Sequence, residues 1–289
     1  MAKNVNEEYP GKTGAPSAKE LKARALDNYK GDVAKKHDFP TEIIDLPSRG
    51  LLYPEDSSLR TGKIELKYMT AKEEDILTTQ SYIKQGVVLD KLFQALIISN
   101  GEGLKVKYNE LLLGDKNAIM IAVRILGYGK DYPIEITNPS GDKQKEDIDL
   151  TQLPEKEIDL ELFKPGINRF PFKLPTSKRT IEFKFLVHGD EPNIEAEIKA
   201  AKKFSKGVDS TLSTRLTYSI VAVDGDEDRM KIRKFVQNEL LALDSRALRK
   251  YMRSIQPDID TTLVLEDNNT GEDFEIDLPI GTDFFWPGA

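Results

Sequence analysis

Two stretches of the chain alternate hydrophobic and polar residues in the same order. Residues 64–68 are Ile-Glu-Leu-Lys-Tyr, and residues 181–185 are Ile-Glu-Phe-Lys-Phe, 117 positions later. Alternation with a period of two residues predicts a β-strand with one buried face. We therefore expect a strand over 64–69 and another over 181–187, and we compare the elements that follow each.

A similar series of elements follows each predicted strand. After the first strand, hydrophobic spacing and capping residues predict a helix over 70–86, a helix over 88–99, a helix beginning at Asp115 and a hairpin over 134–150. After the second strand, they predict a helix over 193–204, a helical or mixed segment over 212–221, an extra helix over 228–241, a helix beginning at Asp244 and a hairpin over 263–278. The predicted fold class is α+β.

The agreement between the two halves extends to single residues. Asp244 follows Asp115 by 129 positions, and Ile-Asp-Leu closes both hairpins, at 148–150 and at 276–278. The change in spacing from 117 to 129 corresponds to about 12 residues inserted in the second half. We interpret the pattern as an internal duplication that produced two homologous modules. The alternative is a pair of unrelated α+β halves that share common patterns.

The two modules are predicted at 62–150 and 177–289. Residues 40–61 contain three prolines, each of which disfavours helix at the preceding residue, so we expect an extended connector there. Residues 151–176 are expected to form a linker between the modules.

Residues 1–39 contain few large hydrophobic side chains. They carry eight Lys and Arg against six Asp and Glu, a charge of +2 in a chain of −7. Such a segment buries too little surface to offset its ordering entropy. We expect a flexible N-terminal arm with one short helix. The role of the arm stays open between a frayed tail and a segment that folds on a partner, for which Leu21 and Tyr29 are the contact candidates.

The composition limits the classes of function. A net charge of −7 argues against binding duplex DNA through its phosphates, so no nucleic-acid partner is expected. The absence of cysteine excludes disulfides, thiol nucleophiles and thiolate zinc sites. No stretch approaches 18 consecutive hydrophobic residues, and the first 30 residues lack the apolar core of a signal peptide. We therefore expect a protein that is made and kept in a cytosol, without a membrane anchor.

The candidate catalytic and metal-binding patterns are incomplete. Asp224, Asp226 and Asp228 fit the first positions of a calcium loop, but the residues that follow lack the Gly and the Glu that such a loop needs. Neither His37 nor His188 has a nucleophile or a paired carboxylate at a diagnostic spacing. We therefore predict no catalytic residues, no cofactor and no metal. A hydrolase that uses scattered Asp and Glu is the enzymatic alternative.

Three aromatic residues stand close together near the end of the sequence, at Phe284, Phe285 and Trp286. Large aromatic side chains dominate the buried contacts between proteins. One hypothesis is that these residues pack on the second half and complete its core. The other is that they anchor a neighbouring subunit, and on that hypothesis they join Leu21 and Tyr29 as partner-contact candidates.

Several short segments carry a resemblance to a known family. They are Leu-Pro-Ser-Arg-Gly at 46–50 with Tyr53, Met-Thr-Ala-Lys-Glu-Glu at 69–74, Gly-Tyr-Gly-Lys-Asp-Tyr at 127–132, Leu-Asp-Ser-Arg-Ala-Leu-Arg at 243–249 and Phe-Phe-Trp-Pro at 284–287. On these segments the chain resembles the T4-like bacteriophage baseplate protein family, whose members are associated with the baseplate hub and its assembly. The resemblance covers most of residues 39–289.

The resemblance implies a non-enzymatic protein of a contractile-tailed phage. It would act through contacts with other phage baseplate or tail proteins, and several copies in a ring are one arrangement. Its location would be the host cytoplasm during assembly and then the baseplate of the virion tail. The alternative is a tail-assembly chaperone that is absent from the finished particle.

The two hairpin turns depart from the pattern of relatives that resemble zinc-knuckle proteins and have cysteines there. This chain has Asn-Pro-Ser-Gly at 138–141 and Asn-Asn-Thr-Gly at 268–271. These residues favour tight turns through their own side chains and backbone preferences. We therefore expect hydrogen-bonded turns and do not carry a zinc site over to this chain.

Overall fold

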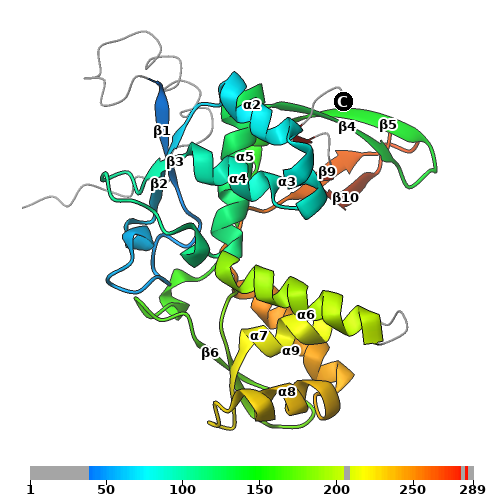
Figure 1. Cartoon of the computed structure of the whole chain (residues 1–289). Helices are drawn as coiled ribbons and strands as arrows, with labels where there is room; N and C mark the ends of the chain where they lie inside the picture. Colours follow the sequence, from blue (N-terminus) through cyan, green and yellow to red (C-terminus); the bar gives the residue numbers. More distant parts are fainter. Residues whose placement is uncertain (1–38, 205–208, 281–283, 286–289) are drawn as a thin grey trace, which may run out of the picture.

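The computed structural model describes residues 39–204, 209–280 and 284–285, which have an α+β architecture (Figure 1). Along the chain the elements fall into two successive groups, which we call the first unit and the second unit. The first unit contains β1 (Thr41–Asp45), β2 (Lys63–Lys67), α2 (Ala71–Thr78), α3 (Gln80–Gln85), α4 (Val88–Leu96), β3 (Ile97–Ser99), α5 (Leu113–Tyr128), β4 (Asp131–Thr137) and β5 (Lys143–Asp149). The second unit contains β6 (Phe170–Lys173), β7 (Thr180–Phe183), α6 (Glu191–Phe204), α7 (Thr211–Ser219), β8 (Ile220–Val223), α8 (Arg229–Asn238), α9 (Ala242–Ile255), β9 (Thr262–Glu266) and β10 (Asp273–Asp277). Short 3₁₀ helices join these elements, at η1 (Ser58–Thr61), η2 (Tyr108–Glu110), η3 (Leu150–Gln152), η4 (Leu160–Leu162) and η5 (His188–Asp190).

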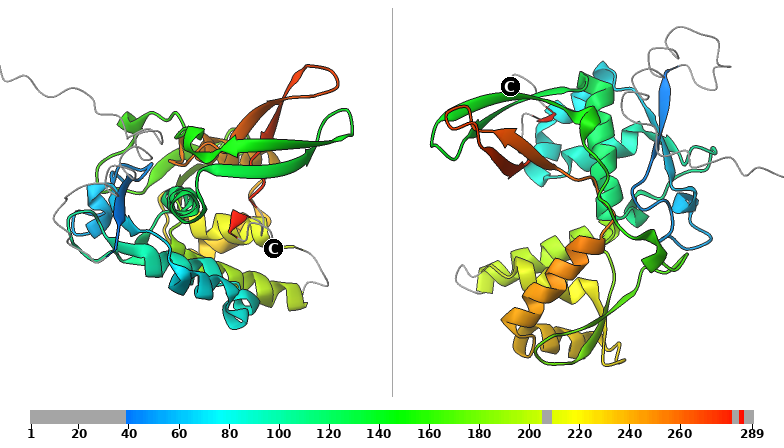
Figure 2. Two further views of the ribbon diagram at one scale, coloured as in Figure 1. Left: turned by 90° about the horizontal axis from the view of Figure 1, so that it is seen from above. Right: turned by 180° about the vertical axis from the view of Figure 1, so that it is seen from behind.

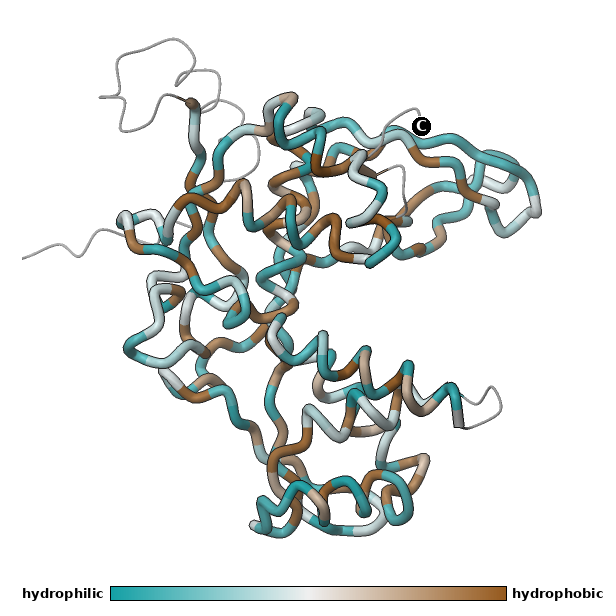
Figure 3. Tube along the Cα trace, in the orientation of Figure 1, coloured by the Kyte–Doolittle hydropathy of each residue, from teal (hydrophilic) through white to brown (hydrophobic). Residues whose placement is uncertain are grey.

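Each unit begins with an antiparallel sheet. The strand order is β1-β2-β3 in the first unit and β6-β7-β8 in the second. The register between the second and third strands shifts between Glu65 and Leu66, and again 117 positions later between Glu182 and Phe183. Side chains from both sheets belong to one hydrophobic core, and Figure 3 shows hydrophobic residues along the strands and helices of both units. The two sheets therefore have the same order and the same irregularity.

A carboxylate holds the backbone after the second strand of each sheet. Glu73 accepts a hydrogen bond from the N–H of Thr70 at 3.1 Å and pairs with the Lys67 ammonium at 2.7 Å. Asp190, 117 positions later, accepts the N–H three residues before it at 3.1 Å and pairs with Lys184 at 2.8 Å. Burial raises the pKa of Glu73, but the hydrogen bonds from Lys67 and Thr70 hold it below its ordinary value.

Asp115 fixes the long helix α5 to the turn that follows β1. Its carboxylate is fully buried and accepts hydrogen bonds from the Ser48 N–H at 2.9 Å, the Ser48 hydroxyl at 2.6 Å and the Tyr53 hydroxyl at 2.6 Å. The prediction that Asp115 begins the helix is therefore wrong, because α5 begins at Leu113 and Asp115 holds a distant turn. Burial raises the pKa of Asp115 to about 6, although the hydrogen bonds from Ser48 and Tyr53 lower it.

Asp244 makes the corresponding contact in the second unit. It is the third residue of α9, so it does not begin that helix either, and it accepts the N–H groups of Thr176 at 2.7 Å and Ser177 at 2.9 Å. Burial raises its pKa, but these hydrogen bonds hold it below the ordinary value. In both turns the next residue is left-handed, with φ of 52° at Arg49 and 61° at Lys178. The two carboxylates and the two turns are each 129 positions apart.

The two hairpins lie side by side, although they belong to different units. Figures 1 and 2 show β9–β10 beside β4–β5, while α6 to α9 form a separate lobe. Near the tips, the Gln144 amide donates to the Glu266 carbonyl at 2.7 Å, and the Asn138 amide donates to the Asp267 carboxylate at 3.1 Å. The hairpin pair therefore joins the end of the second unit to the first.

The units also meet where α5 begins. The N–H of Leu113 donates to the Leu186 carbonyl at 3.2 Å, and the N–H of His188 donates to the Leu111 carbonyl at 2.7 Å. The rings of His188 and Tyr108 lie edge to face with their centroids 4.5 Å apart. His188 is thus buried in the junction between the units.

Several predicted element boundaries are wrong. The helix expected over 70–86 breaks at the extended residue Thr79 into α2 and α3. The helix expected over 88–99 ends at Leu96, and the next three residues form β3, as the residues after Ser219 form β8. The β-branched residues after each helix pair with the central strand of their sheet, and this tertiary contact overrides the helical spacing.

The first strand of each sheet lies outside the module boundaries that we expected. β1 falls in the expected connector at 40–61, and β6 falls in the expected linker at 151–176. Both are edge strands, where a proline such as Pro171 is tolerated because one side of the strand needs no hydrogen-bond donor. Because prolines lie next to or within these strands, the sequence pattern did not predict them as strands of a sheet.

Replacing Asp115 by Ala should destabilise the protein strongly. The substitution leaves the buried Ser48 N–H and the Ser48 and Tyr53 hydroxyls without their acceptor, and we expect a loss of about 3 kcal/mol or more in the free energy of unfolding. Urea denaturation followed by circular dichroism measures it. Asp75→Ala is the control, because Asp75 is exposed on α2 and should change stability by no more than about 0.5 kcal/mol. Equal stability of the two variants would contradict the role of Asp115 as an anchor.

The two anchors should respond to pH with opposite signs. Because the pKa of Asp115 is raised to about 6 in the folded chain, its contribution to stability is full below its ordinary value of 3.8 and is lost as pH rises through 6. The free energy of unfolding of Asp115→Asn, relative to that of wild type, should therefore increase by up to about 3 kcal/mol as the pH rises from 4 to 7. Asp244→Asn is the matched variant. Because the pKa of Asp244 is lowered in the folded chain, its carboxylate stabilises the fold at pH values above its ordinary pKa. Asp244→Asn should therefore be less stable than wild type at neutral pH, and this difference should shrink only as pH falls below about 4. A stability difference that stays constant with pH for Asp115→Asn would refute this assignment.

Candidate interaction surface

The buried ionisable groups of the anchors and the junction are bound to the chain itself. Asp115 is enclosed by Ser48 and Tyr53, and none of these three residues lines the cavity described below. Lys116 lies 2.6 Å from Asp90 and 3.3 Å from Nδ1 of His188. Burial and the neighbouring Lys116 lower the pKa of His188, so the ring stays neutral at physiological pH. These groups are therefore held by partners within the fold, and Lys116 and Asp90 remain partly exposed.

The acidic loop that partly fits a calcium-loop pattern is also internally satisfied. Asp224 pairs with Arg179 at 2.8 Å, Asp226 pairs with Lys231 at 2.5 Å, and Asp228 accepts the N–H of Met230 at 2.8 Å at the start of α8. In the described part of the chain, no group of three or more His, Cys, Asp or Glu residues is placed to hold a metal ion. The loop therefore acts as a helix cap with surface ion pairs.

Hydrogen bonds join the turns of the two hairpins. Asp267 is almost completely buried and accepts from the Asn138 amide at 3.1 Å, the Ser140 hydroxyl at 2.7 Å and the Asn269 N–H at 2.8 Å. The Asn269 amide donates to Asp142 at 2.6 Å. Burial raises the pKa of Asp267, but these hydrogen bonds hold it below its ordinary value, so the carboxylate is a stable acceptor.

The aromatic residues at 284 and 285 pack on the first unit. Phe284 and Phe285 are 0% and 1% exposed. The Phe284 ring lies 5.0 Å from that of Tyr132 and 5.9 Å from the guanidinium of Arg124, and the Phe285 ring lies 6.0 Å from that of Phe93. The hypothesis that these rings complete the second half is therefore wrong. They complete the core of the first unit, and contact with a partner would require them to leave it.

The other partner-contact candidates are outside the described residues. Leu21, Tyr29 and Trp286 fall in segments that the structure does not describe, so their contacts stay predictions. In the described segments, no helix combines the length and the hydrophobicity needed to cross a bilayer.

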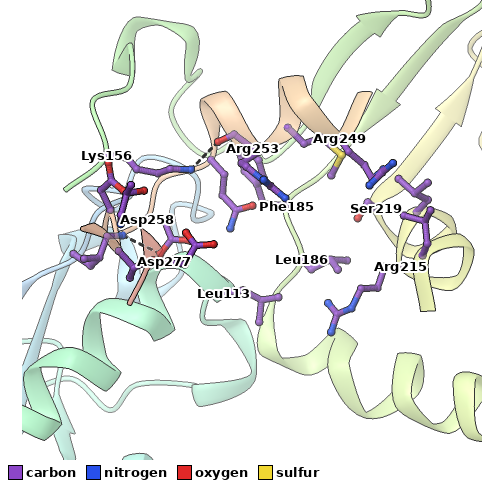
Figure 4. Close-up of a pocket in the computed structure, with 18 residues that line it drawn as sticks. Leu113, Lys156, Phe185, Leu186, Arg215, Ser219, Arg249, Arg253, Asp258 and Asp277 are labelled. Carbon is purple, nitrogen blue, oxygen red and sulfur yellow. Dashed lines mark hydrogen bonds between the residues drawn. The ribbon is translucent and has the colours of Figure 1, made fainter. Parts of the chain in front are cut away.

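A cavity of about 610 Å³ lies between helices α7 and α9 of the second unit and the base of the second hairpin (Figure 4). Its helical wall carries Leu216 of α7 together with Arg249 and Arg253 of α9, and its opposite wall carries Asp258 and Asp260. Sequence analysis missed this site, because its residues come from segments that are distant in sequence and meet only in the folded chain.

Two cavity carboxylates have pKa values that are shifted in opposite directions. Burial raises the pKa of Asp258, while the hydrogen bond from Thr262 lowers that of Asp260. Both oxygens of Asp258 accept from the Asn117 amide, at 3.0 and 3.2 Å, and Asp260 accepts the N–H of Thr262 at 3.0 Å. Each carboxylate thus accepts hydrogen bonds from residues of this chain, although both carboxylates line the cavity.

A family model described as "T4 bacteriophage base plate protein" matches residues 45–286, which include parts of both sheets and both hairpins. The chain belongs to this family. No curated protein and no solved structure matches it. The resemblance on the short segments is therefore confirmed at the level of the family. In this baseplate protein, those segments include the turn that Asp115 binds, the helix that carries Asp244 and the buried aromatic pair.

Replacing Phe284 by Ala should destabilise the baseplate protein by about 3–5 kcal/mol, as expected for a buried phenylalanine that leaves a cavity. Guanidinium denaturation of the purified variant measures the loss. Met230→Ala is the control, because Met230 is 74% exposed and its truncation should be nearly neutral. If Phe284→Ala keeps wild-type stability but the phage no longer assembles, the ring serves a neighbouring subunit and not the core.

Proposed function

We propose that this protein is a structural or assembly component of a contractile-tailed phage baseplate, and that it acts through protein–protein contacts without catalysing a reaction. The observation that carries the proposal is the family match, which extends across both units. On this proposal the protein is present in the host cytoplasm during assembly and then in the virion tail, next to other baseplate or tail proteins. A place in the hub, with several copies in a ring, is part of the proposal.

The repeated contacts support an internal duplication as the origin of the two units. The Lys67–Glu73 pair recurs as Lys184–Asp190, 117 positions later. The bond of Asp115 to a turn recurs as that of Asp244, 129 positions later. Strand order and the register shift agree as well. We infer that one strand-helix-hairpin unit was copied, because unrelated halves have no reason to share these contacts in the same order along the chain.

The enzymatic alternative rests on the cavity pair Asp258 and Asp260, whose pKa values are shifted apart. General acid–base catalysis needs carboxylates that can reach a substrate proton. Here Asn117 uses both oxygens of Asp258, and Thr262 holds Asp260. We therefore prefer a role for both residues in holding the loop between α9 and β9.

The assembly-chaperone alternative differs from the structural proposal in the final location of the protein. A chaperone leaves the finished particle, whereas a structural component stays in it. The family match is compatible with either role.

Quantitative mass spectrometry of purified phage particles tests the structural role. We expect the protein in the particle at a copy number that is a multiple of three or six, because subunits of a symmetric ring occur in such multiples. A known tail protein counted in the same sample serves as the internal standard. If the baseplate protein is absent from particles but present in lysates of infected cells, the result would favour the chaperone role.

A further inference from the structure

The cavity in the second unit corresponds to the place that Phe284 and Phe285 fill in the first. In each unit, a helix leads directly into the third strand, and these helices, α4 and α7, end 123 positions apart. The long helices α5 and α9 are related by the 129-residue spacing of Asp115 and Asp244. With these spacings, each wall of one site can be matched to a wall of the other.

The residues that contact the aromatic pair in the first unit match residues that line the cavity in the second. Phe93, which touches Phe285, matches Leu216 at a spacing of 123. The contacts of Phe284 match likewise at a spacing of 129. Arg124 corresponds to Arg253 and Tyr132 to Thr261, and both counterparts line the cavity. The same site is thus filled by the chain's own aromatic rings in one unit and is a cavity in the other.

The two sites differ in charge, and the difference indicates what the second site binds. Figure 4 shows Arg215 and Arg249 on one wall of the cavity and Asp258 on the other. Arg215 pairs with Glu191 at 2.8 Å. Neither Arg249 nor Arg253 has a side-chain hydrogen bond or ion pair with any residue in the described ranges, and both are exposed. The helical wall therefore offers two arginines beside apolar surface, a combination enriched in protein interfaces.

We propose that this cavity receives an aromatic segment of another baseplate protein, with an acidic residue next to its aromatic side chains. The matching site in the first unit shows that this architecture accepts phenylalanine rings beside an arginine. The volume of about 610 Å³ falls in the range of well-formed binding pockets. Arg249 and Arg253 would pair with the acidic residue and stack on the rings.

A second copy of this chain fits the cavity less well as the source of the segment. Its own Phe284 and Phe285 are buried in its first unit, so exchange would empty one site to fill another and gain little. The occupant is therefore a segment of a different protein. This inference rests on the proposed function for the identity of the partner, but the chemistry of the cavity can be tested separately.

The probe is a labelled synthetic peptide, Pro-Ile-Gly-Thr-Asp-Phe-Phe-Trp-Pro-Gly-Ala, the sequence of residues 279–289, which has the required chemistry. Fluorescence anisotropy with the full-length protein should show saturable binding. Arg249→Glu/Arg253→Glu should weaken it at least about tenfold, because the acidic residue then meets like charge. Leu212→Asp, at a half-exposed apolar position on the cavity wall, should weaken it independently of the arginines.

Arg246→Glu is the matched control, because Arg246 is exposed on α9 but does not line the cavity, and it should bind the peptide like wild type. Absence of saturable binding at peptide concentrations up to about 1 mM, which corresponds to a binding free energy weaker than about −4 kcal/mol, would overturn the proposal. Equal affinity of wild type and both cavity variants would overturn it too, because the peptide would then bind elsewhere, for instance in place of Phe284 and Phe285. Presence of the protein in particles would still support the proposed function if the peptide fails to bind.

Discussion

A buried carboxylate in the first turn of a long helix is the interaction on which each unit depends. Asp115 and Asp244 each accept hydrogen bonds from the turn after the first strand of the sheet. An unpaired carboxylate in such a place would cost several kcal/mol, so only one arrangement of turn and helix satisfies it. Each hairpin is the next element after the anchored helix, and the anchors therefore help to determine where the hairpins project.

The units use the same plan for different purposes. In the first, the long helix and the base of its hairpin are covered by Phe284 and Phe285, so that site is part of the core. In the second, the corresponding walls stay open and carry arginines. Two similar units, one with a closed site and one with an open site, are suited to a protein that must be rigid itself and must also bind a neighbour. The family to which the chain belongs, that of a phage baseplate protein, is consistent with such a part.

Much of this fold could be predicted from the sequence, because several of its determinants are local. The strand at Ile64, the helix start at Thr70 and the hairpin turns follow from alternation, capping and turn preferences. The predictions of the α+β class and of the family were correct, because they too rest on short local segments of the sequence. The prediction of Asp115 as a helix cap failed because a capping residue and a residue that binds a distant turn have the same position in the sequence.

The site was out of reach of sequence patterns for a physical reason. Its walls come from α7, α9 and the loop before β9, and the residues of these segments come together only in the folded chain. The edge strands β1 and β6, which follow or contain a proline, were also missed, as were the strands β3 and β8 that directly follow a helix, since tertiary pairing decides those positions. The burial of Phe284 in the first unit could be seen only in the folded chain, because its contacts Arg124 and Tyr132 are distant in sequence.

The central claim is that this protein is a rigid two-unit part that holds a neighbour through the open site of its second unit. A cryo-electron microscopy reconstruction of the assembled baseplate tests it most directly. The account predicts density for both units in this arrangement, with an aromatic segment of a neighbouring protein between Arg253 and Asp258. A baseplate in which this chain is missing, or in which that cavity faces solvent while other surfaces make the contacts, would contradict it.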